Sequence, residues 1–120
     1  MAICLAGCSG PYRQKPLGPQ SAQFRQVQAM LVELRRAGGD KLDETLARQG
    51  PNGLDEGRRA ALRAVLDELA RADSAELKQL DRFGDHVFRA AIALRRDSTD
   101  RTLYMLLVER DGQLLWAGPN

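Results

Sequence analysis

The spacing of apolar residues changes from helical to strand-like near the middle of this chain, and that change most limits the available folds. In the first half, apolar residues recur at intervals of three and four, which is typical of one buried helix face. In the second half they alternate with polar residues, as in a strand with one buried face. The pattern therefore predicts an α+β fold in which N-terminal helices pack on a C-terminal antiparallel β-meander.

Three helices are predicted in the first half. Ser21 is the expected N-cap of the first helix, and the glycine pair at 38–39 ends it. Asp40 is expected to cap a second, shorter helix that stops at the breaker cluster 50–53, and Asp55 to cap a third. The apolar stripes are Phe24, Val27, Met30, Leu31 and Leu34 in the first helix, Leu42 and Leu46 in the second, and Leu62, Val65, Leu66 and Leu69 in the third.

Charged side chains recur every four residues on the third helix. Residues four apart share one helix face, so neighbouring Asp and Arg side chains are expected to pair along the solvent-facing side. Each exposed pair contributes about 0.3–0.5 kcal/mol. We interpret this row as support for the helix rather than as a ligand site. It consists of Asp55, Arg59, Arg63, Asp67 and Arg71.

The second half is predicted to form strands. Residues 88–94 alternate in polarity, and residues 102–109 are rich in Leu, Val and Tyr. A loop is expected over 97–100 and a weaker turn at 84–85. The stretch 74–96 is open to two interpretations, because it begins with a possible helix capping box and includes a run of high helix propensity. We favour strands there. The capping box would consist of Asp73 and Glu76, and the run is Ala90-Ala91-Ile92-Ala93-Leu94.

The pair Asp111-Gly112 predicts a tight hairpin near the C-terminus. Both central residues of such a turn must adopt a positive φ, which Asp and Gly accept readily. A two-residue turn places Leu107 opposite Trp116. It also places Val108 opposite Leu115. Both faces of the hairpin are then apolar, so we expect the helices to cover one of them.

Composition fits one small domain. The chain has 120 residues and a net charge of +2, with no apolar run near the ~20 residues of a transmembrane helix. Arg13 and Lys15 lie in residues 1–20, which contain no acid, so residues 21–120 balance to zero. Nucleic-acid binding needs clustered cations, so we expect no nucleic-acid partner.

The N-terminus contains the most specific motif. Leu5-Ala6-Gly7-Cys8 resembles the lipobox of bacterial lipoproteins, in which a signal peptidase cuts before the cysteine. The resemblance implies cleavage between Gly7 and Cys8, and lipid attachment, such as palmitate, to Cys8. A thiolate is the side chain that forms a thioether with a diacylglycerol. Residues 1–7 would then be the remnant of a signal peptide whose basic and apolar parts lie upstream. The alternative is a true start at Met1 and a chance match.

Residues 8–20 are predicted to be the lipidated cysteine and a flexible tether. Three prolines disfavour helix in this segment, and two glycines add backbone freedom. Ser9 follows the cysteine, which resembles the sorting pattern for the outer membrane. We therefore expect a lipid-anchored protein of the cell envelope, in the outer membrane and facing the periplasm. Two or more acyl chains are needed for stable anchoring.

The domain 21–120 resembles the NTF2-like (cystatin-like) superfamily, and in particular small bacterial lipoproteins of that kind. The resemblance rests on three helices before a meander, on Phe83-Gly84-Asp85, on the alternating run 88–94, and on Asp111-Gly112 followed by Trp116. It implies a curved sheet wrapped around helices, often with a conical apolar pocket. The superfamily includes isomerases, dehydratases and non-catalytic binding modules, so the fold alone does not fix an activity.

Catalytic groups are scarce. Asp81, Asp85, His86 and Tyr104 are the available acid–base candidates, and we interpret the first three as solvated residues beside a turn. Tyr104 and Trp116 are the candidate pocket residues, although core packing is the simpler interpretation. No catalytic triad, phosphate loop or metal-spaced cluster is present, and the cysteines are limited to Cys4 and Cys8.

Two functions therefore remain from the sequence. The first is a lipid-anchored envelope module without catalytic, cofactor or metal residues, which binds the membrane through its anchor and another envelope protein or an apolar ligand. The second is a soluble NTF2-like enzyme for a small hydrophobic substrate, which requires a closed pocket containing a buried carboxylate.

Overall fold

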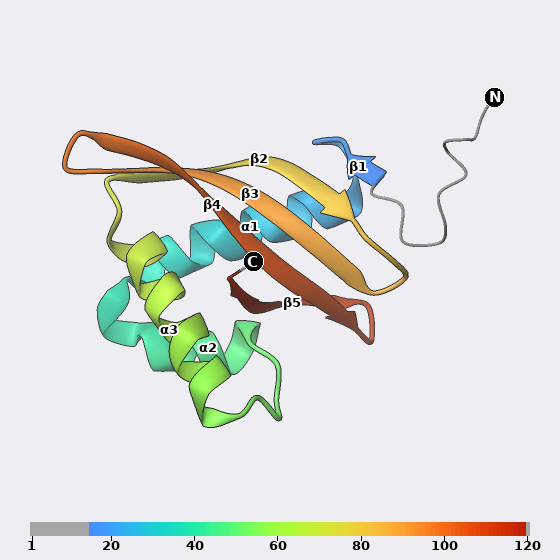
Figure 1. Ribbon diagram of the computed structural model, residues 1–120, viewed down its shortest axis with the longest axis horizontal. Coiled ribbons are helices and arrows are strands. Elements are labelled where there is room, and N and C mark those ends of the chain that lie inside the picture. The colour runs from blue at the N-terminus through green and yellow to red at the C-terminus, as the bar shows by residue number, and fades with distance from the viewer. Residues whose placement is uncertain (1–14, 120) are drawn as a thin grey trace.

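The computed structural model describes residues 15–119 and shows helices packed against one curved antiparallel sheet (Figure 1). The helical elements come first after a short initial strand, and the remaining four strands follow in an unbroken meander. The α+β prediction is confirmed. In chain order the elements are β1 (Lys15–Leu17), α1 (Ala22–Ala37), η1 (Gly39–Lys41), α2 (Leu42–Gln49), α3 (Glu56–Arg71), β2 (Ser74–Arg82), β3 (Val87–Arg96), β4 (Thr99–Arg110) and β5 (Gln113–Pro119).

Local capping sets the ends of the two long helices, as the sequence predicted. The Oγ of Ser21 accepts a hydrogen bond from the backbone N–H of Phe24 at 3.1 Å. Asp55 accepts one from the N–H of Arg58 at 2.8 Å. Each cap satisfies an N–H that has no partner within its helix. At the other end of α1, the N–H of Gly38 donates to the carbonyl of Leu34. The positive φ of Gly38, 80°, then turns the chain out of the helix.

The prediction that Asp40 caps α2 is wrong. Gly38 turns the chain into the short 3₁₀ helix η1, and Asp40 lies inside it. The residue before α2 is Lys41, which makes no side-chain capping bond. The carboxylate of Asp40 lies instead 3.8 Å from the guanidinium of Arg71 on α3.

Of the charged side chains that recur every four residues on α3, one neighbouring pair forms an ion pair along the helix. Arg71 donates to Asp67 at 2.8 Å, and this hydrogen bond, with the carboxylate charge, raises the pKa of Arg71 above its usual value. Arg63 forms an ion pair with Asp43 on α2 at 3.0 Å, whereas the sequence pattern predicted a partner on its own helix. Asp55 pairs with Arg58 rather than Arg59, because its carboxylate caps the helix. Packing against α2 therefore redirects part of the row.

The sheet has the order β1-β2-β3-β4-β5, and every neighbouring pair is antiparallel. Residues 74–96 form strands, as we favoured, with the expected turn at 84–85 between β2 and β3. Asp73 forms no capping box. Its Oδ2 accepts the N–H of Asp97 at 3.0 Å, so it helps to hold the β3–β4 turn.

The β4–β5 hairpin has the predicted register. Asp111 and Gly112 have φ values of 53° and 78°, and Leu107 lies opposite Trp116. Val108 likewise lies opposite Leu115. The predicted loop over 97–100 is shorter than expected, because Asp97 and Ser98 both adopt positive φ and let the chain reverse within two residues. Residues 99 and 100 then already pair with β3.

The predicted flexible tether ends earlier than expected. Residues 15–17, which the sequence assigned to it, form β1 and pair with β2 at Leu80–Arg82. Pro16 is compatible with this position because β1 is an edge strand. Leu17 also packs against the hydrophobic core, and this contact stabilises the short strand. The predictions for residues 1–14, which include the lipobox and cleavage site, concern positions outside the described residues.

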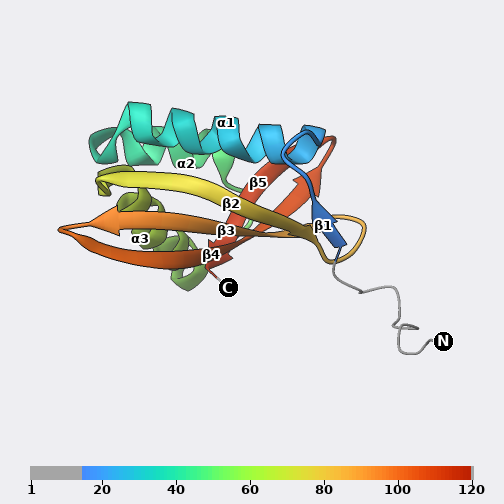
Figure 2. The same ribbon diagram turned by 90° about the horizontal axis from the view of Figure 1, so that it is seen from above.

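The hydrophobic core fills the space between the helices and the inner face of the sheet. Figure 2 shows α1 running along β2 on that side. The strand residues of the core alternate with outward-facing ones, as the period of two requires. No helix within residues 15–119 has the length and apolar character needed to cross a membrane. The largest fully buried side chains are Trp116, Phe88, Leu34, Leu42, Leu62, Leu66, Leu69, Leu80, Ile92, Met105, Leu107 and Leu114.

Candidate functional site

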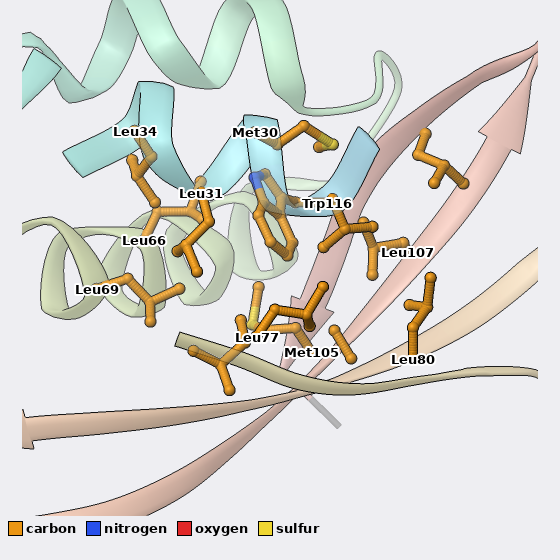
Figure 3. Packing of buried hydrophobic residues seen from close by; sticks show 14 of the residues in the cluster. Met30, Leu31, Leu34, Leu66, Leu69, Leu77, Leu80, Met105, Leu107 and Trp116 are labelled. Atoms are coloured by element: carbon orange, nitrogen blue, oxygen red, sulfur yellow. The ribbon is translucent and has the colours of Figure 1, made fainter. Parts of the chain in front are cut away.

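The interior, where a conical pocket was the expectation from the resemblance, is occupied by side chains. Trp116 has no exposed surface, and Figure 3 shows it among Met30, Leu31 and Leu107. Leu77 and Met105 lie on the sheet side of the same cluster. The indole ring therefore takes the place that a ligand would need between α1 and the strands.

A buried polar contact fixes the orientation of Trp116. Its Nε1–H donates to the Oε1 of Gln49, the last residue of α2, at 2.8 Å. The Nε2 of Gln49 donates to the carbonyl of Met30 at 3.1 Å and to Glu33 at 2.6 Å. Gln49 is only 4% exposed, so these bonds replace the water that its amide loses. One side chain thus joins α1, α2 and β5.

Gln49 is a structural residue that was not predicted from the sequence. A signal was present, because Leu42, Leu46 and Gln49 succeed one another at spacings of four and three, so Gln49 continues the apolar stripe of α2. A polar residue on a buried stripe requires a partner. Its partner lies 67 positions further along the chain, which no local pattern could identify.

The rim beside Gln49 is polar and open. Gln26 of α1 accepts the N–H of Leu114 at 2.5 Å, which ties the start of β5 to the helix. Glu33 lies 3.6 Å from Arg48, and both side chains are about half exposed. A groove beside these residues is lined by side chains of α1, α2 and β5. Its charged groups already pair with each other, so we assign it a structural role.

The outer face of the sheet contains the more distinctive cluster, which we call the Arg89 cluster: Asp81, Phe83, Arg89 and Tyr104. The guanidinium carbon of Arg89 lies 5.1 Å from the ring centroid of Phe83 and 5.2 Å from that of Tyr104. Both distances fall within the range of cation–π attraction. The same guanidinium is 3.8 Å from the carboxylate of Asp81.

Burial differs sharply within the Arg89 cluster. Asp81 is 2% exposed and also accepts a hydrogen bond from Gln79 at 3.0 Å, whereas Tyr104 is 43% exposed. The interpretation of Asp81 as a solvated turn residue is therefore wrong. Asp81 lies on β2, opposite Pro16 of β1 on one side and opposite Arg89 of β3 on the other, so both neighbouring strands flank it. The cluster combines a fixed cation with an accessible aromatic ring.

The remaining candidates are scattered. His86 is largely exposed and lies 3.7 Å from Glu109, and Asp85 is exposed in the turn. Tyr104 and Trp116 lie on opposite faces of the sheet, so they do not line one pocket. The sequence held a signal for this, since Tyr104 is an odd number of residues from Leu107, the partner of Trp116. Gly7 and Cys8 lie outside the described residues, which also contain no cluster of potential metal ligands.

The fold of this domain is similar to that of a solved structure. A solved structure of a variant of Rd1NTF2_05, a designed NTF2 protein, matches it with a TM-score of 0.50 and 18% sequence identity. The match covers 82% of this chain and 95% of that one. The fold is therefore NTF2-like, with three helices packed on a five-stranded meander. No protein-family model and no curated protein matches the sequence.

Proposed function

We propose that this chain is a lipid-anchored lipoprotein of the bacterial cell envelope whose NTF2-like domain is a non-catalytic binding module. The anchor is a lipid on Cys8 after cleavage at Gly7, and Ser9 directs the protein to the outer membrane on its periplasmic side. The partners are the membrane, through the anchor, and another envelope protein. The motif Leu5-Ala6-Gly7-Cys8 is the single observation that carries this proposal.

The position of β1 supports a short attachment. Seven peptide steps separate Cys8 from Lys15, and a chain of that length spans at most about 25 Å. Lys15 pairs with Arg82 at one end of the sheet. An anchor on Cys8 would therefore hold the domain close to the bilayer and by a defined end of the sheet.

The interior and the outer face support binding rather than catalysis. Trp116 and its neighbours fill the interior, and among the described residues the buried ionisable side chain is Asp81, on the outer face. A substrate for acid–base chemistry would need space beside such a group. On the outer face, Arg89 and Tyr104 are residue types that often dominate the energy of protein interfaces. We propose the Arg89 cluster as the partner-binding surface.

Metabolic labelling with an alkyne fatty acid tests the anchor. The protein is produced from its own locus, so that any upstream signal is translated. We expect label in the native protein and in the Cys4→Ser control, and no label with Cys8→Ser, because only the Cys8 thiol is lipidated. An unlabelled native protein, or one that still carries label after Cys8→Ser, contradicts the proposal.

A further inference from the structure

One long edge of the sheet is only partly covered. β1 pairs with β2 at residues 80–82, and within the described part of the chain no strand pairs with that edge over residues 74–79. An edge of this kind presents unpaired backbone N–H and C=O groups. Only another extended chain can satisfy them in a regular way.

An apolar groove runs beside this open edge. Its wall on α1 includes Val32, which is 50% exposed, and its wall on β2 includes Ala75 and Leu77. Arg35 holds the far end of α1 in place, since its guanidinium donates to the carbonyls of Leu69 and Ala72 at 2.8 and 3.1 Å. Figure 2 shows α1 and β2 side by side along this length.

The charges on the open edge are self-complementary. Glu76 and Lys78 flank Leu77, and their side chains are 68% and 57% exposed. Lys78 lies in a bulge of β2, where the register with β3 shifts between Leu77 and Gln79, and its side chain is exposed like that of Glu76. When two copies of β2 pair antiparallel with Leu77 opposite Leu77, Glu76 of each copy lies beside Lys78 of the other. Opposite charges directly across an antiparallel pair stabilise it, and like charges destabilise it. Within one chain these two side chains already pair at 2.8 Å, so exchanging partners needs only side-chain rotation.

We propose that this edge is a homodimer interface, in which β2 pairs with β2 of a second copy about a two-fold axis at Leu77. The two meanders then form one continuous sheet with both α1 helices on the same side. The grooves meet at the axis, and the exposed Val32 side chains become covered. The interface is isologous, as a two-fold axis requires: each copy contributes the same surface.

Sedimentation equilibrium of the full chain, in reducing buffer, tests the proposal over about 1 µM to about 1 mM, a range suited to a small interface. We expect reversible dimers of the native chain. Glu76→Lys and Lys78→Glu each place like charges opposite one another twice, so each raises the dimer Kd about tenfold or more. An equimolar mixture of the two variants recovers dimerisation, because every Lys then faces a Glu. The double variant E76K/K78E dimerises like the native chain.

A second pair of variants tests the groove. Val32→Glu places a charge on its apolar wall and prevents dimerisation, while Val87→Glu, at a residue that is 40% exposed on β3, does not. Thermal unfolding confirms that each variant is folded. A native chain that stays monomeric at the highest concentration overturns the proposal, even if it binds a foreign extended peptide at 74–79. So does a dimer that is indifferent to the charge exchanges, or one that Val87→Glu disrupts as strongly as Val32→Glu.

Discussion

The hydrogen bond between Trp116 and Gln49 should make a measurable contribution to stability that depends on both partners. Gln49→Met keeps the length of the side chain and removes its amide. The buried indole N–H then has no acceptor, which costs about 1–3 kcal/mol, and the carbonyl of Met30 loses a donor, which costs about 1 kcal/mol more. Glu33 is half exposed and can rehydrate, so it adds little. We expect a total loss of about 2–4 kcal/mol.

Trp116→Phe removes the other partner. It leaves the Oε1 of Gln49 without its donor and opens a small cavity, at a total cost of about 2–4 kcal/mol. In the double variant neither side of this bond remains unpaired. The double variant should therefore lose about 1–2 kcal/mol less than the sum of the single losses.

Urea unfolding followed by far-UV circular dichroism measures all four proteins, and the same series by heat should show Gln49→Met lowering Tm by about 10 °C. Gln113→Met is the matched control, since its amide makes a long, exposed contact of 3.5 Å to Arg48. It should change stability by less than about 0.5 kcal/mol. Additive losses in the double variant, or a control as damaging as Gln49→Met, would refute the assignment of this contact.

Three further variants test the elements that shape the domain, each by urea unfolding. Arg35→Met removes three donors from carbonyls at the end of α3, at 2.8, 3.1 and 3.3 Å, and should cost about 1–3 kcal/mol; a neutral result would contradict this role. Gly112→Ala places a side chain at φ 78° and should cost about 1 kcal/mol, so unchanged stability would be inconsistent with the turn geometry. Ser21→Ala removes the N-cap of α1 and should lower Tm by about 4 °C, whereas Ser21→Asp should restore it.

Local physics explains which elements the sequence could predict. Ser21 and Asp55 begin helices because their side chains satisfy N–H groups three residues away. Asp111-Gly112 forms a tight turn because these residues accept positive φ, and the turn then fixes the register of Leu107 against Trp116. The period of the apolar residues separated helices from strands for the same reason, since it depends only on backbone geometry.

Long-range packing decided where side chains such as Asp40 and Asp81 lie, and local sequence patterns could not predict it. The sequence marks Asp40 as a cap, but the turn after Gly38 places it beside Arg71 instead. It marks Asp81 as a solvated residue, but two neighbouring strands bury it beside Arg89.

The sequence by itself therefore determined the order and type of most elements, the hairpin register, and the motif at Cys8 on which the proposed anchor depends. Only the tertiary structure decided that Lys15–Leu17 join the sheet, that Gln49 holds Trp116, and that no strand within residues 15–119 pairs with the outer edge of β2 over 74–79. The two groups of features differ in how far apart along the chain the interacting residues lie. Caps, turns and periods are interactions among residues a few positions apart, whereas burial, strand edges and buried polar pairs depend on segments that meet only after the chain has folded.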